Sequence, residues 1–143
     1  MSGALGTAAL AEVERLHRFF EAWFRGSLPR DAAAFAACAD ALAAGFVQVD
    51  PQGREHRRGD LLARLEAAHG CRADAPFAIT IEDARVLLER DGLALVTYVE
   101  LQVSGSTTTA RGSTALLVAD SVAPLGAAWL HLQETWIAPA GRA

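Results

Sequence analysis

A row of polar side chains on two adjoining predicted strands holds the residues best suited to chemistry. Gly105-Ser106 is a two-residue hairpin signal, and centring the turn on it places Glu100 opposite Arg111. Because side chains alternate along a strand, every second residue shares this face. The row consists of Tyr98, Glu100, Gln102, Thr109, Arg111 and Ser113. A carboxylate facing a guanidinium suits a structural ion pair as well as the wall of a ligand site.

Other residues with chemical potential lie outside this row. Asp50-Pro51-Gln52-Gly53 has turn chemistry, because Asp accepts local N–H bonds, Pro presets φ and Gly closes the turn. His17 lies on the apolar side of a predicted helix, which favours a core residue over a catalyst. Cys38 and Cys71 form no CxxC pair and have no metal-ligand spacing with the histidines. We therefore expect no metal and no cofactor, with Cys38 buried and Cys71 in a loop.

The first half of the chain predicts three helices and a short hairpin. Apolar residues at helical spacing indicate a helix from about Thr7 to Arg25, which Gly26 ends. Pro29 opens a second helix that carries Leu42 on its apolar face and stops at Gly45. A strand at Val47 to Val49 leads into the Asp50 turn. A third helix follows Gly59, with Asp60 as its N-cap and Gly70 at its end.

The second half has the two-residue period of β-strands. The predicted strands are Phe77 to Glu89, Gly92 to Ser104, Thr107 to Asp120 and Ala128 to Ile137. Helices grouped against one face of an antiparallel sheet define an α+β domain. We expect a single domain over residues 1–143, with its core at about 7–138.

Composition narrows the classes of function. The chain has 143 residues, 52% hydrophobic, with a net charge of −4. A negative chain does not attract a phosphate backbone, so no nucleic-acid partner is expected, and the short basic stretch from Arg54 to Arg58 is interpreted as a solvated strand edge. No apolar run reaches the length of a membrane span, and no signal peptide is recognisable. These features favour a cytoplasmic protein without a membrane partner.

This order of elements resembles the NTF2-like superfamily over about Leu10 to Ile137. The resemblance rests on three stretches: the first helix closed by Gly26, Val49-Asp50-Pro51-Gln52-Gly53 followed by Arg58-Gly59, and Trp129-Leu130-His131-Leu132-Gln133-Glu134-Thr135-Trp136. The pattern looks similar to SnoaL-like and DUF4440-type proteins, and to the association (hub) domain of calcium/calmodulin-dependent protein kinase II. It implies a cone in which three N-terminal helices pack on a curved antiparallel sheet and leave a pocket.

The ketosteroid isomerases of this superfamily imply a catalytic role for Asp50. In those enzymes the aspartate before Pro-x-Gly moves a proton, and a carboxylate that faces an apolar pocket has the raised pKa that such a base needs. The donors that stabilise the enolate oxygen have no match here. Their positions fall on Phe19 and near Ser113 or Thr114. Asp50 as a base and Asp50 as the cap of its own turn both stay open.

The hub domains imply a different ligand chemistry. Their pocket arginines, which can hold a carboxylate, fall here on Glu100, near Thr114 and on Glu134. Because two of these charges are reversed, we expect any charged ligand to be a cation or a hydrogen-bond donor. If Glu100 and Arg111 neutralise each other, Glu134 is left to interact with His56, His131 or a ligand.

Aromatic side chains complete the expected pocket. The set predicted to line it is Phe19, Phe20, Trp23, Phe46, Tyr98, Glu100, Arg111, Ser113, Glu134 and Trp136. Such a pocket predicts a protein that binds a small apolar molecule, with a cofactor-independent isomerase-, cyclase- or lyase-like activity as one form of that function. The alternative is a non-catalytic, hub-like dimerisation or assembly module.

The opposite face of the sheet predicts a homodimer. It carries Leu95, Thr97, Val99, Leu101 and Val103. A bare apolar face of this kind is an aggregation hazard unless a second subunit covers it. On the last strand, strict alternation places Trp129, His131 and Gln133 toward that partner.

Overall fold

The first helix contributes two aromatic residues, Phe19 and Trp23, to the core. The computed structural model describes residues 3–137, so the ends of the domain predicted over residues 1–143 lie outside the described part. Helix α1 (Ala4–Arg25) buries one face, including Val13, Leu16 and Trp23. Gly26 ends the helix in the left-handed conformation, with φ of 77°, as predicted.

Helix α1 begins earlier than the predicted start at Thr7. A carboxylate oxygen of Glu89 accepts the backbone N–H groups of Gly3 and Gly6, each at 2.9 Å. The first N–H groups of a helix have no partner within the helix, and a capping acceptor stabilises them. Since Glu89 lies far along the chain, this cap has no local signal in the sequence.

The second helix is shorter than predicted. Helix α2 spans Ala32–Ala39, with the Asp31 side chain as its N-cap, and strand β1 spans Leu42–Val49. The prediction that the helix continues to Gly45 is therefore wrong. Strand β1 pairs in parallel with the last strand, starting where Leu42 faces Trp129. Alanine prefers a helix, but this preference is weak and tertiary contacts can override it. Pairing with the last strand therefore determines the conformation of this segment.

The short hairpin forms as predicted, but the third helix has other ends than predicted, with Arg57 and Ala68 at its caps in place of Asp60 and Gly70. Strand β2 (Glu55–Arg57) pairs antiparallel with β1 around the Asp50 turn. Helix α3 spans Arg58–Ala67 with Arg57 at its N-cap, so Asp60 lies in the first turn and the prediction of Asp60 as N-cap is wrong.

Four long strands complete the sheet close to their predicted boundaries. They are β3 (Phe77–Arg90), β4 (Leu93–Ser104), β5 (Thr107–Ala119) and β6 (Ala127–Ile137). The β4–β5 ladder has the predicted register, with Glu100 opposite Arg111 and Tyr98 opposite Ser113. The strand order is β2-β1-β6-β5-β4-β3, so β1 joins the short hairpin to the long meander.

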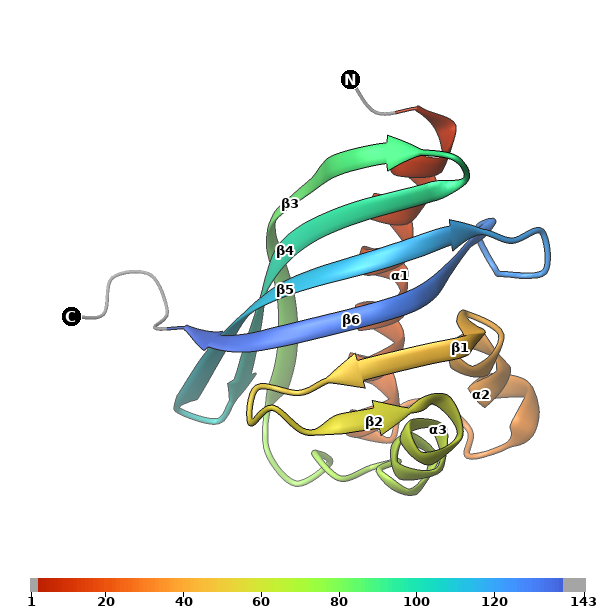
Figure 1. Ribbon diagram of the computed structural model, residues 1–143. Helices are drawn as coiled ribbons and strands as arrows, with labels where there is room; N and C mark the ends of the chain where they lie inside the picture. Colours follow the sequence, from red (N-terminus) through yellow and green to blue (C-terminus); the bar gives the residue numbers. More distant parts are fainter. Residues whose placement is uncertain (1–2, 138–143) are drawn as a thin grey trace.

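The sheet bends around α1 (Figure 1). The β3–β4 register shifts between Glu82 and Arg85, and Asp83 there has a φ of 55°. A bulge of this kind bends a strand and increases its twist. The helices meet the concave face, and the convex face carries none (Figure 1). The predicted α+β cone with a curved sheet is confirmed.

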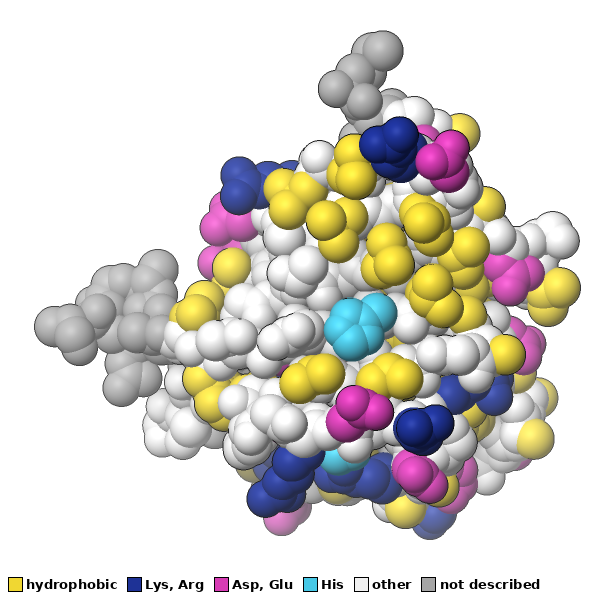
Figure 2. All heavy atoms as spheres, viewed as in Figure 1, with side chains coloured by type: hydrophobic (Ala, Val, Ile, Leu, Met, Phe, Trp, Pro, Cys, Tyr) yellow, Lys and Arg dark blue, Asp and Glu magenta, His cyan; other side chains and the backbone are white. Residues whose placement is uncertain are grey.

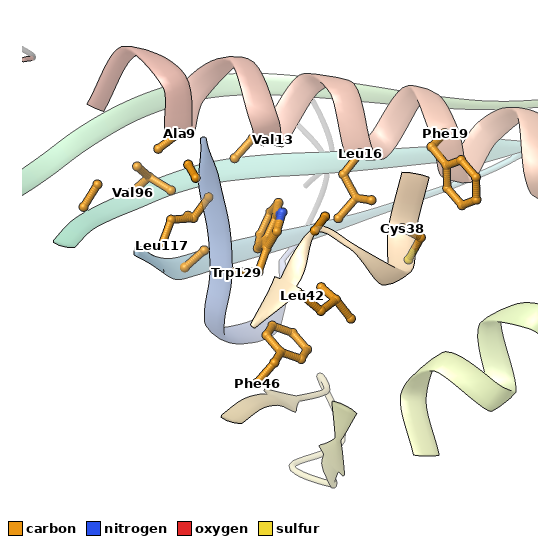
Figure 3. Close-up of a cluster of buried hydrophobic side chains, with 14 of the residues drawn as sticks. Ala9, Val13, Leu16, Phe19, Cys38, Leu42, Phe46, Val96, Leu117 and Trp129 are labelled. Atoms are coloured by element: carbon orange, nitrogen blue, oxygen red, sulfur yellow. The ribbon is translucent and has the colours of Figure 1, made fainter. Parts of the chain in front are cut away.

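A second bulge changes which residues of β6 face inward. Leu116 pairs with His131 and Leu117 pairs with Trp129, so Leu130 is an extra residue in the ladder. The prediction that Trp129 shares the outer face of His131 is wrong, because one inserted residue reverses the alternation on one side of it. Trp129 is only 1% exposed and lies beneath α1 among the core side chains (Figure 3).

Both cysteines lie where the sequence predicts. Cys38 is buried in the core beside Phe19 of α1 (Figure 3), and Cys71 is exposed in the loop after α3. Burial comes first among the causes that raise the pKa of the Cys38 thiol to about 12. The thiol is therefore inert at neutral pH.

Candidate functional site

A cavity of about 120 Å³ lies between α1, α3 and the concave face of the sheet. Its apolar wall consists of Phe20, Phe24, Phe46 and Trp129 together with leucines of α1, β1, α3 and β6. Its polar wall consists of His17, Gln48, Glu100, Gln102, Arg111 and Glu134. A mostly apolar cavity with a few converging polar groups is typical of a small-molecule site. We call it the inner cavity.

A second hollow adjoins the inner cavity. It has a volume of about 320 Å³ and lies beside the Asp50 turn, with His56, Arg64 and Trp136 on its wall. Five residues line both spaces: Gln48, Leu61, Leu65, Arg111 and Glu134. We call this second space the outer hollow. It is more open than the inner cavity and therefore forms the approach to it.

The first charged pair of the inner cavity joins α1 to β4. His17 Nε2 lies 3.1 Å from a carboxylate oxygen of Glu100, and His17 Nδ1 lies 2.7 Å from the Val13 carbonyl. Gln102 donates to the other Glu100 oxygen at 2.6 Å. His17 and Glu100 are 3% and 4% exposed, so the pair is shielded from solvent. The expectation that His17 is a core residue is right about its burial, but it misses this carboxylate.

The pKa values of this pair favour the ionised forms. Burial alone would lower the pKa of His17, yet the charge of Glu100 and the hydrogen bond between them raise it above its ordinary value. Burial alone would raise the pKa of Glu100, but His17 and Arg111 lower it to about 2. Both shifts therefore favour an imidazolium–carboxylate pair.

The second charged cluster joins β5, β6 and β1. Arg111 Nη1 donates to one oxygen of Glu134 at 3.2 Å, and Gln48 donates to the other at 2.7 Å. The Arg111 guanidinium lies over the Trp136 ring, 4.7 Å from its centroid, which fixes its plane. The predicted Glu100–Arg111 pair has the right register but no direct ion pair, because Arg111 turns to Glu134 and Glu100 turns to His17.

Glu134 differs from Glu100 in its titration. Burial raises the pKa of Glu134, Arg111 lowers it, and the nearby charge of Glu100 raises it again, so the pKa stays above its ordinary value. Two carboxyls of one cavity thus have pKa values pushed apart, an arrangement that proton-transfer sites use. Glu134 is the carboxyl of the pair that takes up a proton more readily.

Asp50 caps its own turn at the edge of the outer hollow. One carboxylate oxygen accepts the N–H groups of Gln52 and Arg54, each at 2.9 Å, and the other lies 2.8 Å from His56 Nε2. The hydrogen bond from His56 is the largest cause that lowers the pKa of Asp50. The expectation of a raised pKa at Asp50 is therefore wrong, and the geometry supports its role as a turn cap.

The residues predicted to line a pocket fall into three groups. Those on the wall of the inner cavity are Phe20, Phe46, Glu100, Arg111 and Glu134, and Trp136 lines the outer hollow. Phe19 and Trp23 stack on each other in the core instead. Tyr98 and Ser113 are buried on the concave face but are not on the inner cavity wall. Burial raises the pKa of Tyr98 well above its ordinary value, so its phenol stays protonated.

The prediction missed three polar groups of the inner cavity wall, namely His17, Gln48 and Gln102. Gln48 lies between the two valines that predict its strand, and its amide donates to Glu134 on β6. Gln102 belongs to the predicted polar row but was not assigned to the pocket. Among the described residues, no cluster of His, Cys, Asp and Glu could hold a metal ion. In the same part of the chain, every helix is too short or too polar to span a bilayer.

A protein-family comparison covers all the elements around the inner cavity. The family model described as sucrose-6-phosphate phosphohydrolase C-terminal matches residues 10–138. The chain belongs to this family. No curated protein matches the chain in sequence.

Solved structures establish the NTF2-like fold of the chain. An NTF2-like protein of unknown function from Pseudomonas aeruginosa has a TM-score of 0.81 and 26% identity, over 92% of this chain and 99% of that one. A putative calcium/calmodulin-dependent kinase II association domain from Exiguobacterium sibiricum has a TM-score of 0.64 and 18% identity, over 98% of both chains.

A third similar structure is a CaMKII hub from S. rosetta. It has a TM-score of 0.67 and 18% identity, over 96% of this chain and 100% of that one. The resemblance to the NTF2-like superfamily is thus confirmed. The narrower resemblance to SnoaL-like and DUF4440-type proteins stays a prediction.

Proposed function

We propose that the chain binds a small, mostly apolar molecule in the inner cavity. The observation that carries this proposal is the cavity itself, where aromatic and leucine walls surround two buried charged clusters. Burying charged groups is unfavourable for folding unless they are paired, and proteins often retain such groups at functional sites. The pairing here satisfies the charges and leaves the space between them open.

The size of the cavity limits the ligand. An engineered cavity of about 150 Å³ holds benzene. The inner cavity, at about 120 Å³, suits a single small ring or a short chain, and a longer ligand would extend past Arg111 into the outer hollow. A polar group of the ligand is therefore expected at the junction between the two spaces, beside Arg111 and Glu134.

A cavity-filling variant tests the proposal. Leu61→Trp places an indole in the space that Leu61 of α3 borders, whereas Leu125→Trp adds the same ring at an exposed loop position. In a thermal-shift screen of apolar enones, small acids and small amines, we expect a ligand at about 100 times its Kd to stabilise the wild type by about 2.7 kcal/mol. Leu125→Trp should keep this stabilisation and Leu61→Trp should lose it. A screen in which no compound stabilises the wild type would argue against the proposal.

We infer proton transfer as a second candidate function, consistent with the SnoaL-like resemblance and a reaction without a cofactor. The specific support is the divergence of the two carboxyls, with the pKa of Glu134 raised and that of Glu100 lowered. This supports Glu134 in preference to Asp50 as the base, because the pKa of Glu134 is raised and that of Asp50 is lowered. A carboxylate with a raised pKa in an apolar cavity suits abstraction of a proton beside a carbonyl group.

Assembly through the convex face is the alternative function, and a second copy of this chain is the partner that we propose. Hydrophobic side chains gather over the strands on this face (Figure 2). One row crosses four strands through successive pairs, namely Leu88, Leu95, Leu116 and His131. Leu88 is 51% exposed in the single chain. The similarity to two hub structures supports a role in assembly.

A further inference from the structure

Arg111 is the charged group of the inner cavity whose hydrogen-bonding capacity is least used. Each oxygen of Glu100 and of Glu134 already has a protein donor within hydrogen-bond distance, and both ring nitrogens of His17 are engaged. Arg111 differs from these groups. Within residues 3–137 only its Nη1 has an acceptor, and its buried Nε has none. Since a guanidinium also carries N–H groups on Nη2, the unused capacity of the charged cluster is that of a donor.

The charges around the cavity leave little room for a charged ligand. His17 balances Glu100 at 3.1 Å, and Arg111 balances Glu134 at 3.2 Å. A bound anion would share Arg111 with Glu134, and a bound cation would lie beside the positive charge of Arg111 and would share carboxylates that are already paired. Either charge would be buried without full compensation, which is unfavourable. A neutral group avoids this penalty.

We propose that the inner cavity takes a small neutral carbonyl compound, whose oxygen accepts a hydrogen bond from Arg111. This inference rests on the proposed function and specifies its ligand class. The stacking of Arg111 on Trp136 holds the guanidinium at the junction of the two hollows, where a polar atom of the ligand would lie. The carbon body would lie against Phe20, Phe46 and Leu61. This ligand class, a neutral hydrogen-bond acceptor, replaces the expectation of a cationic or hydrogen-bond-donating ligand.

A matched set of probes tests the ligand class. Cyclohexanone, cyclohexylamine, cyclohexanecarboxylate and cyclohexane share one ring and differ in charge and hydrogen bonding. Dissociation constants are measured for the full chain at neutral pH by ligand-observed NMR titration. Because a hydrogen bond from a charged donor is among the stronger ones, we expect the ketone to bind about tenfold or more tightly than each of the other three.

Two variants test the role of Arg111. Arg111→Met alone would leave Glu134 buried without its cation, so Arg111→Met is combined with Glu134→Gln and compared with Glu134→Gln alone. The double variant should bind cyclohexanone about tenfold or more weakly than Glu134→Gln. Arg57→Met, at an exposed position of β2, should bind like the wild type. Circular dichroism of each variant confirms that it is folded.

The outcomes separate the two proposals. Equal ketone binding by the double variant and by Glu134→Gln overturns the role of Arg111. Binding of the amine, the acid or the hydrocarbon as tightly as the ketone overturns the ligand class but leaves the proposed pocket standing. Failure of all four probes to bind the wild type overturns both.

Discussion

Glu100 and Glu134 show how neighbouring charges set the behaviour of buried carboxyls. Both point to the concave side of the sheet, and both lose solvation there. Glu100 has an imidazolium beside it and the charge of Arg111 nearby, whereas Glu134 shares Arg111 and also faces the negative charge of Glu100. The second carboxylate in one cavity is the more difficult to ionise, so Glu134 keeps its proton to higher pH.

The pKa of Glu100 predicts stability that is lost in acid. Its ordinary pKa is 4.5 and its folded pKa is about 2, so its contribution is present above 4.5 and disappears as the pH falls toward 2. The difference corresponds to a contribution on the order of 3 kcal/mol. Urea unfolding of the wild type and Glu100→Gln over a pH series should show a larger acid-side loss of stability in the wild type. Glu82→Gln, at an exposed position of β3, should behave like the wild type.

The same experiment reports on His17. Because its folded pKa is raised, its contribution is complete below the ordinary value of 6.5 and is lost as the pH rises through the folded pKa. Glu100→Gln removes the main cause of that shift, so the loss on the alkaline side should shrink as well. A variant that keeps both the acid and the alkaline loss would contradict the pairing of His17 with Glu100.

Asp50 and Glu134 can be separated as candidate bases. If the protein transfers protons, it should catalyse deuterium exchange at the carbon beside the carbonyl of cyclohexanone in D₂O, which NMR follows directly. We expect Glu134→Gln to reduce the exchange rate by about 100-fold or more, and Asp50→Asn to retain it, since an amide oxygen can still cap the turn. Loss of exchange in Asp50→Asn with its retention in Glu134→Gln would assign the base to Asp50.

At the scale of elements, the junction between α2 and β1 depends on Arg58. Its guanidinium donates to the carbonyl of Ala39 at 2.7 Å and to that of Leu42 at 2.9 Å. The last carbonyls of a helix have no N–H donor within the helix. A cation at this end can donate to them and interacts favourably with the negative end of the helix dipole. Arg58 thus stabilises the point at which the alanine-rich segment leaves the helix.

We expect Arg58→Met to destabilise the fold by about 1–3 kcal/mol, because it removes two hydrogen bonds from a charged donor to partly buried carbonyls. The neighbouring Arg57→Met serves as the control, since Arg57 is exposed on strand β2. Chemical denaturation measures both variants. Equal stability of the two would show that the α2–β1 boundary does not depend on the Arg58 side chain.

At the scale of the whole molecule, one bent sheet presents two different surfaces. Its concave face packs on the helices and encloses the inner cavity, while its convex face carries the row from Leu88 to His131. Since the ligand site and the proposed contact surface lie on opposite faces, ligand binding and self-association can be disrupted separately.

The proposed homodimer predicts a change of mass on a single substitution. Leu95→Glu puts a charge in the middle of the convex row, whereas Leu125→Glu puts one on a loop outside the sheet. Sedimentation velocity should show the wild type and Leu125→Glu as dimers or larger assemblies, and Leu95→Glu as a monomer. A monomeric wild type would exclude this face as a stable contact between copies.

Features that depend on neighbours along the chain were predictable from the sequence. The period of α1, its end at Gly26, the turn at Asp50 and the four strands follow from local spacing and turn chemistry. The hairpin at Gly105-Ser106 even determined the β4–β5 register, and with it the shared face of Glu100 and Arg111. Short-range geometry suffices for these because each involves residues that are close in sequence or joined by one tight turn.

Contacts between groups that are far apart along the chain became known only from the tertiary structure. His17 and Glu100 are 83 residues apart, and Gln48 and Glu134 are 86 residues apart. Neither pairing has a local signal, and the parallel contact of β1 with β6 overrode the helical preference of the alanine run. The extra residue at Leu130 turned Trp129 inward, because a one-residue shift reverses the faces of a strand. The set of residues that line the inner cavity therefore depends on long-range packing, which local sequence patterns do not predict.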